Sequence, residues 1–251
     1  MIKVLQKTFD LLEYAAGSPH PVLPRETADA LGLPQPTAAR LLRDLAELGY
    51  LEQSGPRKGY RLGPVPFHLA GGKLYDDEYM RFVSATVKEC AREMGQSILF
   101  AVRRRASRYI LCHYNFNPGF LIDTSRIRYH DLYGTGSGRM LLAFAPENEL
   151  GELIAELGLP SPDIWPEAAP DRGRLLHELG KIRTDREAEM PRSLCGNFHV
   201  YARPVFRNRV FAGVVGANWE PDSPSARSES YREQITILAA RLSEARKLVV
   251  G

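Results

Sequence analysis

The chain has 251 residues, of which 44% are hydrophobic and 25% charged, and its formal net charge is +3 at pH 7. This composition is that of an ordinary globular protein, and the length allows two modest domains. No apolar run approaches the roughly 18 residues that a membrane helix needs, so we expect no membrane partner.

The N-terminal residues and the cysteines indicate where the protein works and which kinds of site it lacks. The N-terminal residues mix acids with apolar residues and lack a secretory core, so we expect a cytoplasmic protein. Three scattered cysteines without a Cys-x-x-Cys motif argue against a structural zinc site or a disulfide framework. We therefore expect neither metal nor cofactor.

Three helices are predicted at the N-terminus. Apolar residues at helical spacing predict the first over residues 3–16, and Gly17 with Pro19 stops it. Pro24 suits the first position of a second helix over 24–31. A short turn follows, and residues 37–48 place apolar side chains on one stripe of a third helix.

A β-hairpin is predicted after the third helix. Two short strands, 50–53 and 60–63, flank the turn Ser-Gly-Pro-Arg-Lys-Gly. No acid occurs from Gln53 to Tyr75, whereas Arg57, Lys58 and Arg61 do. This local basic stretch favours a nucleic-acid contact more than the small net charge does.

The rest of the chain mixes helical and strand patterns. Residues 64–78 contain Pro and Gly and are taken as the linker. Strands are predicted at 97–102, 108–114, 120–124, 197–206 and 210–218, and helices at 79–94, 138–144, 147–157, 172–184 and 225–249. We predict an α+β fold with a DNA-binding domain over 1–63, a linker over 64–78, and a second domain with an antiparallel sheet over 79–251.

Two helices, a short turn and a basic hairpin in this order are typical of a winged helix-turn-helix, whose second helix enters the major groove of DNA. Gln35 can pair with adenine, and Arg40 with guanine or a phosphate. The predicted DNA-binding residues are Pro24, Gln35, Pro36, Thr37, Ala39, Arg40, Arg43, Arg57 and Lys58. The alternative is a generic three-helix cluster that contacts proteins.

The stretch TADALGLPQPTAARLLRDLAELGYLEQSGPRKGYRLG resembles the winged-helix pattern of the IclR family of bacterial transcription regulators. Before the arginine of the recognition helix, that family commonly has Lys-Ser-Thr-Val-His. Here Gln-Pro-Thr-Ala-Ala, residues 35–39, precedes Arg40. The scaffold is kept while the base-reading positions differ, so no known operator sequence carries over.

The second domain resembles the same family more loosely. DLYGTGSGRMLLAFAP is similar to the family's Pro-Leu-His-x-Thr-Ala-x-Gly-Lys-x-x-Leu-Ala motif, and FHVYARPVFRNRVFAGVVGANW to its closing hairpin. The resemblance implies a GAF-like, profilin-like effector domain that follows a linker helix. It also implies a homodimer or a dimer of dimers that responds to a small organic molecule. The second half is nearest to members that activate aromatic-acid catabolism.

A Gly-rich turn leads into the predicted helix at 138. Free backbone N–H groups of Gly136, Ser137 and Gly138 can point at an anion there, and a carboxylate effector would fit. As a nucleotide-phosphate loop the motif is weak. A plain Gly-rich turn is the alternative interpretation.

The last hairpin is expected to form a wall of the effector pocket. Residues 199, 201 and 203 share one face of the strand and 198, 200 and 202 the other, and the sequence leaves open which face meets the ligand. The predicted effector-binding residues are Arg126, Tyr133, Thr135, Gly136, Ser137, Asn197, His199, Tyr201 and Asn218.

Two other functions are weighed against a regulator. An enzyme needs a nucleophile with its base, or a metal cluster. The histidines are isolated in the sequence, and Cys195 with His199 is weak evidence for a catalytic thiol–imidazole pair. We therefore expect no enzyme. An architectural DNA-binding protein without a ligand would not need the sizeable second domain. The effector, the regulated operon and the sign of regulation stay open.

Overall fold

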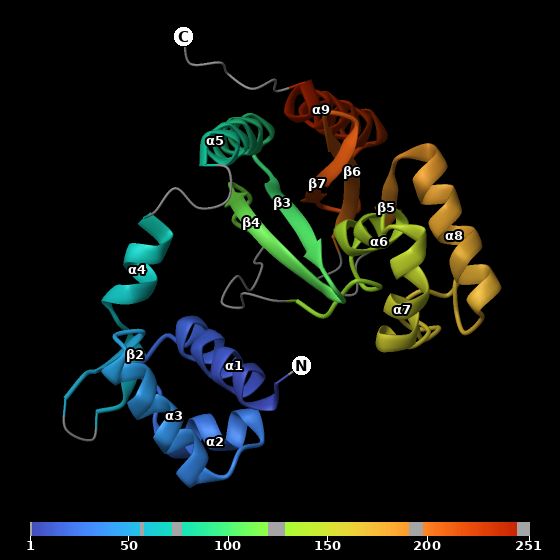
Figure 1. Ribbon diagram of the computed structural model, residues 1–251. Coiled ribbons are helices and arrows are strands. Elements are labelled where there is room, and N and C mark those ends of the chain that lie inside the picture. Colours follow the sequence, from blue (N-terminus) through green and yellow to red (C-terminus); the bar gives the residue numbers. More distant parts are fainter. Residues whose placement is uncertain (1, 56–57, 72–76, 120–128, 191–197, 245–251) are drawn as a thin grey trace. The chain divides into compact units, whose positions relative to one another are not determined.

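The computed structural model describes residues 2–55, 58–71, 77–119, 129–190 and 198–244. The chain forms two compact units that divide between Asp77 and Glu78, here named the N-terminal and C-terminal units (Figure 1). Arg57, Arg126, Asn197 and the strand expected at 120–124 lie outside the described residues, as does the predicted helix beyond Glu244.

Three helices and a hairpin form the N-terminal unit. They are α1 (Lys3–Gly17), α2 (Pro24–Leu31), α3 (Gln35–Glu47), β1 (Leu51–Gln53) and β2 (Tyr60–Leu62). Their apolar faces meet in one core, in which Leu11, Leu42 and Leu51 are buried. The predicted helix-turn-helix with a hairpin is confirmed.

The turn between α2 and α3 is short. Gly32 ends α2 in the left-handed conformation (φ 61°), and the Leu33 N–H donates to the Ala28 carbonyl at 2.9 Å. Pro34 then precedes α3, and Pro36 occupies its second position, where no N–H is needed.

The stretch expected to be a linker contains a helix of its own, α4 (Pro64–Gly71). Pro64 stands at its first position, which tolerates proline. None of the helices in the described ranges is long and apolar enough to cross a membrane.

A five-stranded antiparallel sheet forms the centre of the C-terminal unit. Its strands are β3 (Ser97–Arg104), β4 (Ser107–Asn115), β5 (Ala188–Met190), β6 (His199–Arg207) and β7 (Val210–Trp219). They lie in the order β4-β3-β7-β6-β5, and every neighbouring pair is antiparallel. The predicted α+β class is confirmed.

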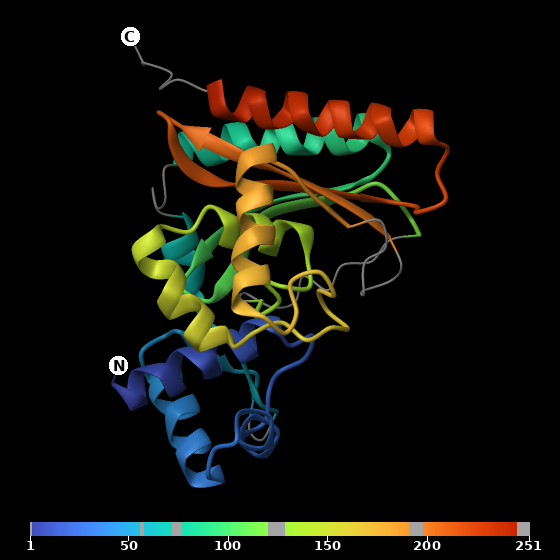
Figure 2. The same ribbon diagram turned by 90° about the vertical axis from the view of Figure 1, so that its right-hand side faces the viewer.

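Helices cover both faces of this sheet (Figure 2). On one face, α5 (Asp77–Met94) and α9 (Ser225–Glu244) pack against Phe100, Val215 and Trp219. On the other, α6 (Gly136–Ala143) lies against Leu99 and Ala202, with α7 (Glu147–Leu157) and α8 (Arg172–Asp185) packed around it.

Two further elements differ from the sequence-based expectation. β5 was not predicted, because three residues are too few to show an alternating pattern; its pairing with β6 creates it. α6 begins at Gly136 rather than at residue 138, because Thr135 caps it.

Truncating the core of the N-terminal unit should destabilise it. Leu42 is 0% exposed and Leu48, just after α3, is 66% exposed. We expect Leu42→Ala to lower the free energy of unfolding by about 2–5 kcal/mol, and the matched control Leu48→Ala to change it by about 0.5 kcal/mol or less. Urea denaturation followed by circular dichroism measures both. Equal losses would contradict the assigned core.

Candidate nucleic-acid interface and effector site

One face of α3 is fixed by the core. Ala38, Leu42 and Leu45 are buried at helical spacing against α1 and β1. The side chains on the opposite face therefore point to solvent. Of the predicted DNA-binding residues on α3, those with exposed side chains are Gln35, Pro36, Arg40 and Arg43, and those half-buried are Thr37 and Ala39.

Arg40 is available for a partner. Its side chain is 82% exposed, and its Nε lies 3.7 Å from Asp44 Oδ2, one helical turn away. Exposed pairs of this kind contribute about 0–1 kcal/mol, so a DNA phosphate or base can replace Asp44. Among the described residues, Arg43 has no ion-pair partner.

The wing, defined here as residues 51–62, presents a further cation. Lys58 is exposed and has no ion-pair partner among the residues that the structure describes. Arg61, by contrast, lies 2.6 Å from Glu52 Oε1 across the hairpin. The wing can therefore offer Lys58 to a phosphate while the Arg61–Glu52 pair joins its strands.

At the start of α2, the structure adds a candidate that the sequence reasoning missed. Pro24 is the first residue of α2 and is half-buried, whereas Arg25 beside it is exposed. A cation in the first turn of this helix can contact the DNA backbone. In the sequence, the position of Arg25 directly after Pro24, the predicted first residue of the helix, was the signal for this candidate.

The two faces of β6 carry different chemistry. Tyr201 packs with Trp219 and Tyr231 on the α9 face, and the His199 ring stacks on Trp219 at 4.5 Å. Val200 lies on the opposite face, against α6. His199 and Tyr201 therefore do not line one pocket with the α6 loop, as the prediction had placed them.

His199 belongs instead to a charge cluster beneath α9. Glu189 Oε1 lies 2.6 Å from His199 Nε2 and accepts a hydrogen bond from Arg232 Nε at 3.0 Å. Burial lowers the pKa of His199, although the Glu189 carboxylate opposes this. The cluster joins β5, β6 and α9.

One backbone N–H group at the start of α6 already has a hydrogen-bond partner within the protein, contrary to the prediction. Thr135 is the N-cap: its Oγ1 accepts a hydrogen bond from the Gly138 N–H at 3.0 Å and donates to the Asp131 carbonyl at 3.3 Å. The Gly138 N–H, which was expected to be free for an anion, is thus satisfied.

Gly136 is required for packing. A Cβ atom there would lie 2.9 Å from Val200 Cγ1 and 3.5 Å from the Ala188 carbonyl oxygen. The first turn of α6 therefore rests directly on β5 and β6. A bulky residue at 136 would disturb the fold and would not report on a ligand.

Tyr133 is engaged within the protein. Its hydroxyl donates to the Gly158 carbonyl at 2.9 Å, its ring lies 6.4 Å from that of Trp165, and burial raises its pKa to about 12. The phenol therefore holds the loop after α7.

Polar side chains gather on the α6 face of the sheet. Ser97 pairs with Asn218 across β3 and β7, and Ser97 Oγ lies 2.8 Å from His113 Nε2. Ser137 Cβ lies 3.7 Å from where a Cβ of Gly216 would be, two residues before Asn218 on the same face. We name Ser97, His113, Ser137 and Asn218 the polar patch.

The polar patch brings hydrogen-bonding side chains together inside the C-terminal unit. Ser97, Ser137 and Asn218 are buried, and burial lowers the pKa of His113, which favours its neutral form. Sequence reasoning had named Ser137 and Asn218 but missed Ser97 and His113. For Ser97, the available signal was one polar residue on the same strand face as the apolar residues Leu99 and Ala101.

A separate hollow of about 510 Å³ lies among α8, β5 and residues 163–167. Arg139 in its wall stacks on Trp165 at 4.1 Å and donates to the Tyr133 and Ile164 carbonyls. The acidic and basic residues that line the hollow are Asp163, Glu167, Glu178, Asp185, Glu187 and Glu189, and Arg139 and Lys181. This excess of carboxylates does not suit an anion.

Among the described residues, no group of three or more His, Cys, Asp or Glu could hold a metal ion.

Residues 4–55 match the family model of the IclR helix-turn-helix domain. The HTH-type transcriptional regulator TtgV of Pseudomonas putida is 24% identical over 162 residues, which cover 62% of this chain and 59% of that protein. The match to this curated relative thus spans less than two thirds of the relative's length.

Solved structures resemble the chain over nearly its whole length. One is a putative ICLR transcriptional regulator from Silicibacter sp. TM1040 (TM-score 0.75, 19% identity, 96% of this chain and 94% of that one). Another is an IclR homolog from Microbacterium hydrocarbonoxydans complexed with 4-hydroxybenzoate (TM-score 0.74, 19% identity, 95% and 97%). At these identities the likeness shows the fold. Residues 4–55 thus match the IclR helix-turn-helix domain, and the whole chain has the fold of IclR transcriptional regulators.

Proposed function

We propose that this chain is a bacterial transcription regulator that binds double-stranded operator DNA and responds to a small organic acid. The exposed face of α3 carries the proposal: Gln35, Arg40 and Arg43 point outward from a helix whose other face is core, within an IclR-type domain. The second helix of such a motif enters the major groove. We place this regulator in the cytoplasm and propose that it controls a catabolic operon.

Arg40→Ala should weaken specific DNA binding by about 1–3 kcal/mol, because a lost bidentate contact to a base costs that much. The probe is a duplex that the wild-type full-length chain selects from a random-sequence library, titrated at fixed salt. Arg172→Ala, which removes an exposed arginine from α8 of the other unit, is the matched control and should bind like the wild type. Equal affinities for all three proteins would remove Arg40 from the interface.

We propose that the polar patch binds the carboxylate of the effector. Ser97, Ser137 and Asn218 supply hydroxyl and amide donors, and the N-terminus of α6 adds the positive end of its helix dipole. The acid-rich hollow beside α8 would repel an anion. A solved IclR homolog holds 4-hydroxybenzoate, and this supports an aromatic acid as the class to test first.

The wild-type chain should melt at a higher temperature with 4-hydroxybenzoate, since a ligand at a hundredfold excess over its Kd adds about 2.7 kcal/mol of apparent stability. Asn218→Ala should reduce this shift by half or more. Asn148→Ala, on the exposed surface of α7, is the control and should leave the shift unchanged. A chain that responds to no aromatic acid, or an Asn218→Ala variant with the full shift, contradicts the assignment.

We also propose that the chain works as a homodimer or a dimer of dimers. Leu5 and Phe9, one turn apart on α1, are 48% and 55% exposed, and Ile2 before the helix is 65% exposed. Apolar side chains gathered on one helix face favour a protein contact. A second copy would supply a second α3 for the other half-site of an operator.

Phe9→Glu should shift the chain toward the monomer, because a carboxylate would be buried in the contact. Light scattering after size-exclusion chromatography measures the mass. Lys7→Glu, an exposed polar position on the same helix, should leave the assembly intact. An unchanged mass for Phe9→Glu would place the contact elsewhere.

The proposal includes no catalytic activity. Ser97 and His113 make the contact that a nucleophile and its base would make. Within the described residues, however, no carboxylate orients the His113 ring, and an effector can use the same two groups as hydrogen-bond partners. Hydrolysis of a simple ester that is abolished in Ser97→Ala would contradict this part of the proposal.

A further inference from the structure

The segment between α1 and α2, residues 18–23, is joined to the wing. The Val22 N–H donates to the Tyr60 carbonyl at 2.8 Å, and the Tyr60 N–H donates to the Val22 carbonyl at 2.9 Å. Val22 therefore pairs with β2 on the side opposite β1, and its side chain is fully buried in the core of the unit. The base of the wing is held by this segment.

Gly59 brings the two backbones together. Its φ is +85°, and a Cβ atom there would lie 2.8 Å from the Pro21 carbonyl oxygen and 2.9 Å from that of Val22. Both the conformation and the close approach require glycine. No side chain separates the two backbones at this contact. A displacement of residues 21–22 would therefore also displace Gly59 and Tyr60 of the wing.

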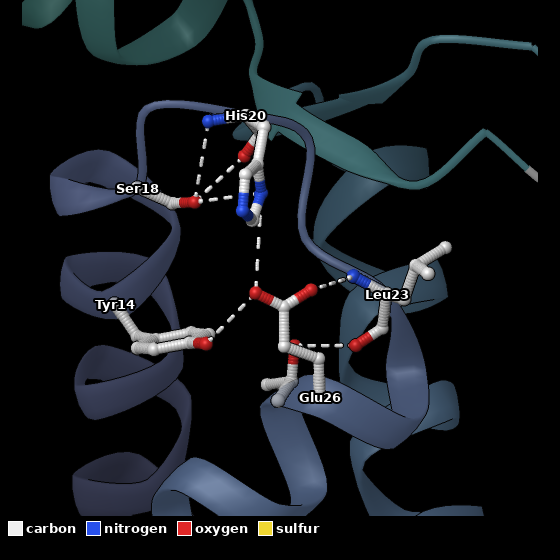
Figure 3. Close-up of polar contacts among 6 residues, drawn as sticks. Tyr14, Ser18, His20, Leu23 and Glu26 are labelled. Atoms are coloured by element: carbon white, nitrogen blue, oxygen red, sulfur yellow. Dashed lines mark hydrogen bonds and ion pairs between the residues drawn. The ribbon is translucent and has the colours of Figure 1, made fainter.

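A single carboxylate holds the C-terminal end of the segment, next to Val22 (Figure 3). Glu26 Oε2 accepts the Leu23 N–H at 3.3 Å, which is one half of a capping box. Glu26 Oε1 accepts the Tyr14 hydroxyl of α1 at 3.2 Å and lies 3.9 Å from His20 Nδ1. Glu26 thus ties α1, the segment and α2 together.

Neighbouring contacts keep this arrangement in place. Burial raises the pKa of Tyr14, and the negative charge of Glu26 raises it further. The phenol therefore remains a hydrogen-bond donor. Ser18 Oγ donates to the His20 carbonyl at 2.7 Å, which closes the turn before Val22. The segment is therefore held at both ends.

We infer that Glu26 is a positioning residue for the wing: by fixing residues 18–23, on which Gly59 and Tyr60 rest, it sets where Lys58 meets DNA. The inference rests on the proposed DNA-binding function. Glu26 itself need not touch DNA. A purely structural role, in which Glu26 only stabilises α2, would weaken binding without changing the contribution of Lys58.

A double-mutant cycle separates the two roles. Affinity is measured for the full-length chain with the duplex selected from a random-sequence library by the wild type. Lys58→Ala alone should weaken binding on the order of fivefold and lower the salt slope by about one. In a Glu26→Ala background, Lys58→Ala should weaken binding by about twofold or less.

Two further variants guard against misfolding. Glu26→Gln keeps an acceptor for the Leu23 N–H and a polar group beside Tyr14, so it should restore the full effect of Lys58→Ala. If Glu26→Ala does not fold by circular dichroism, Tyr14→Phe replaces it in the cycle, because it removes only the hydroxyl that holds Glu26. Asp29→Ala, an exposed carboxylate of α2 with the same change in charge, is the control and should leave the Lys58→Ala effect intact.

The outcomes are distinct. Independent effects of Glu26 and Lys58, with no coupling beyond that of Asp29→Ala, overturn the inference and leave DNA binding standing. A wild-type chain that enriches no sequence from the library rejects the proposed function and, with it, this inference.

Discussion

Alternation of side chains along antiparallel strands is the constraint on which the C-terminal unit depends. On β6 and β7 it sends Tyr201 and Trp219 into the core beneath α5 and α9, and Val200 and Asn218 toward α6. No residue of these strands can serve both faces. The charge cluster of Glu189 with Arg232 is thereby kept apart from the polar patch. The patch carries hydrogen-bonding side chains, while the opposite face carries half-buried charges.

Both proposed binding sites depend on close backbone contacts at a glycine. Gly136 lets the first turn of α6 rest on β5 and β6, and this brings Ser137 to the polar patch. Gly59, next to Lys58, lets the wing approach residues 21–22 closely. In each case a missing side chain is what allows two elements to touch. We expect substitutions at these glycines to act through geometry, since neither residue has a side chain that could contact a ligand.

The sequence was informative where a pattern is local. Helical spacing around Leu42 and the glycine-rich turn of the wing suffice to predict the helix-turn-helix and its hairpin. The strands of the sheet follow from their alternation, except β5, whose three residues become a strand only through pairing with β6. Which face of β6 meets α6 was beyond the sequence, because alternation separates His199 from Val200 without saying which helix covers either. Ser97 and His113 meet only through the pairing of β3 with β4, and single-sequence reasoning does not provide that register.

The positions of the two tryptophans confine the intrinsic tryptophan fluorescence to one unit of the protein. Both tryptophans of the chain, Trp165 and Trp219, lie in the C-terminal unit, where they are nearly inaccessible to water. Arg139 stacks on the first and His199 on the second. The N-terminal unit contributes no indole to the intrinsic emission. Indole fluorescence therefore reports on the unit proposed to bind the effector, and a change in that emission when DNA is added would be a direct sign that the two units communicate.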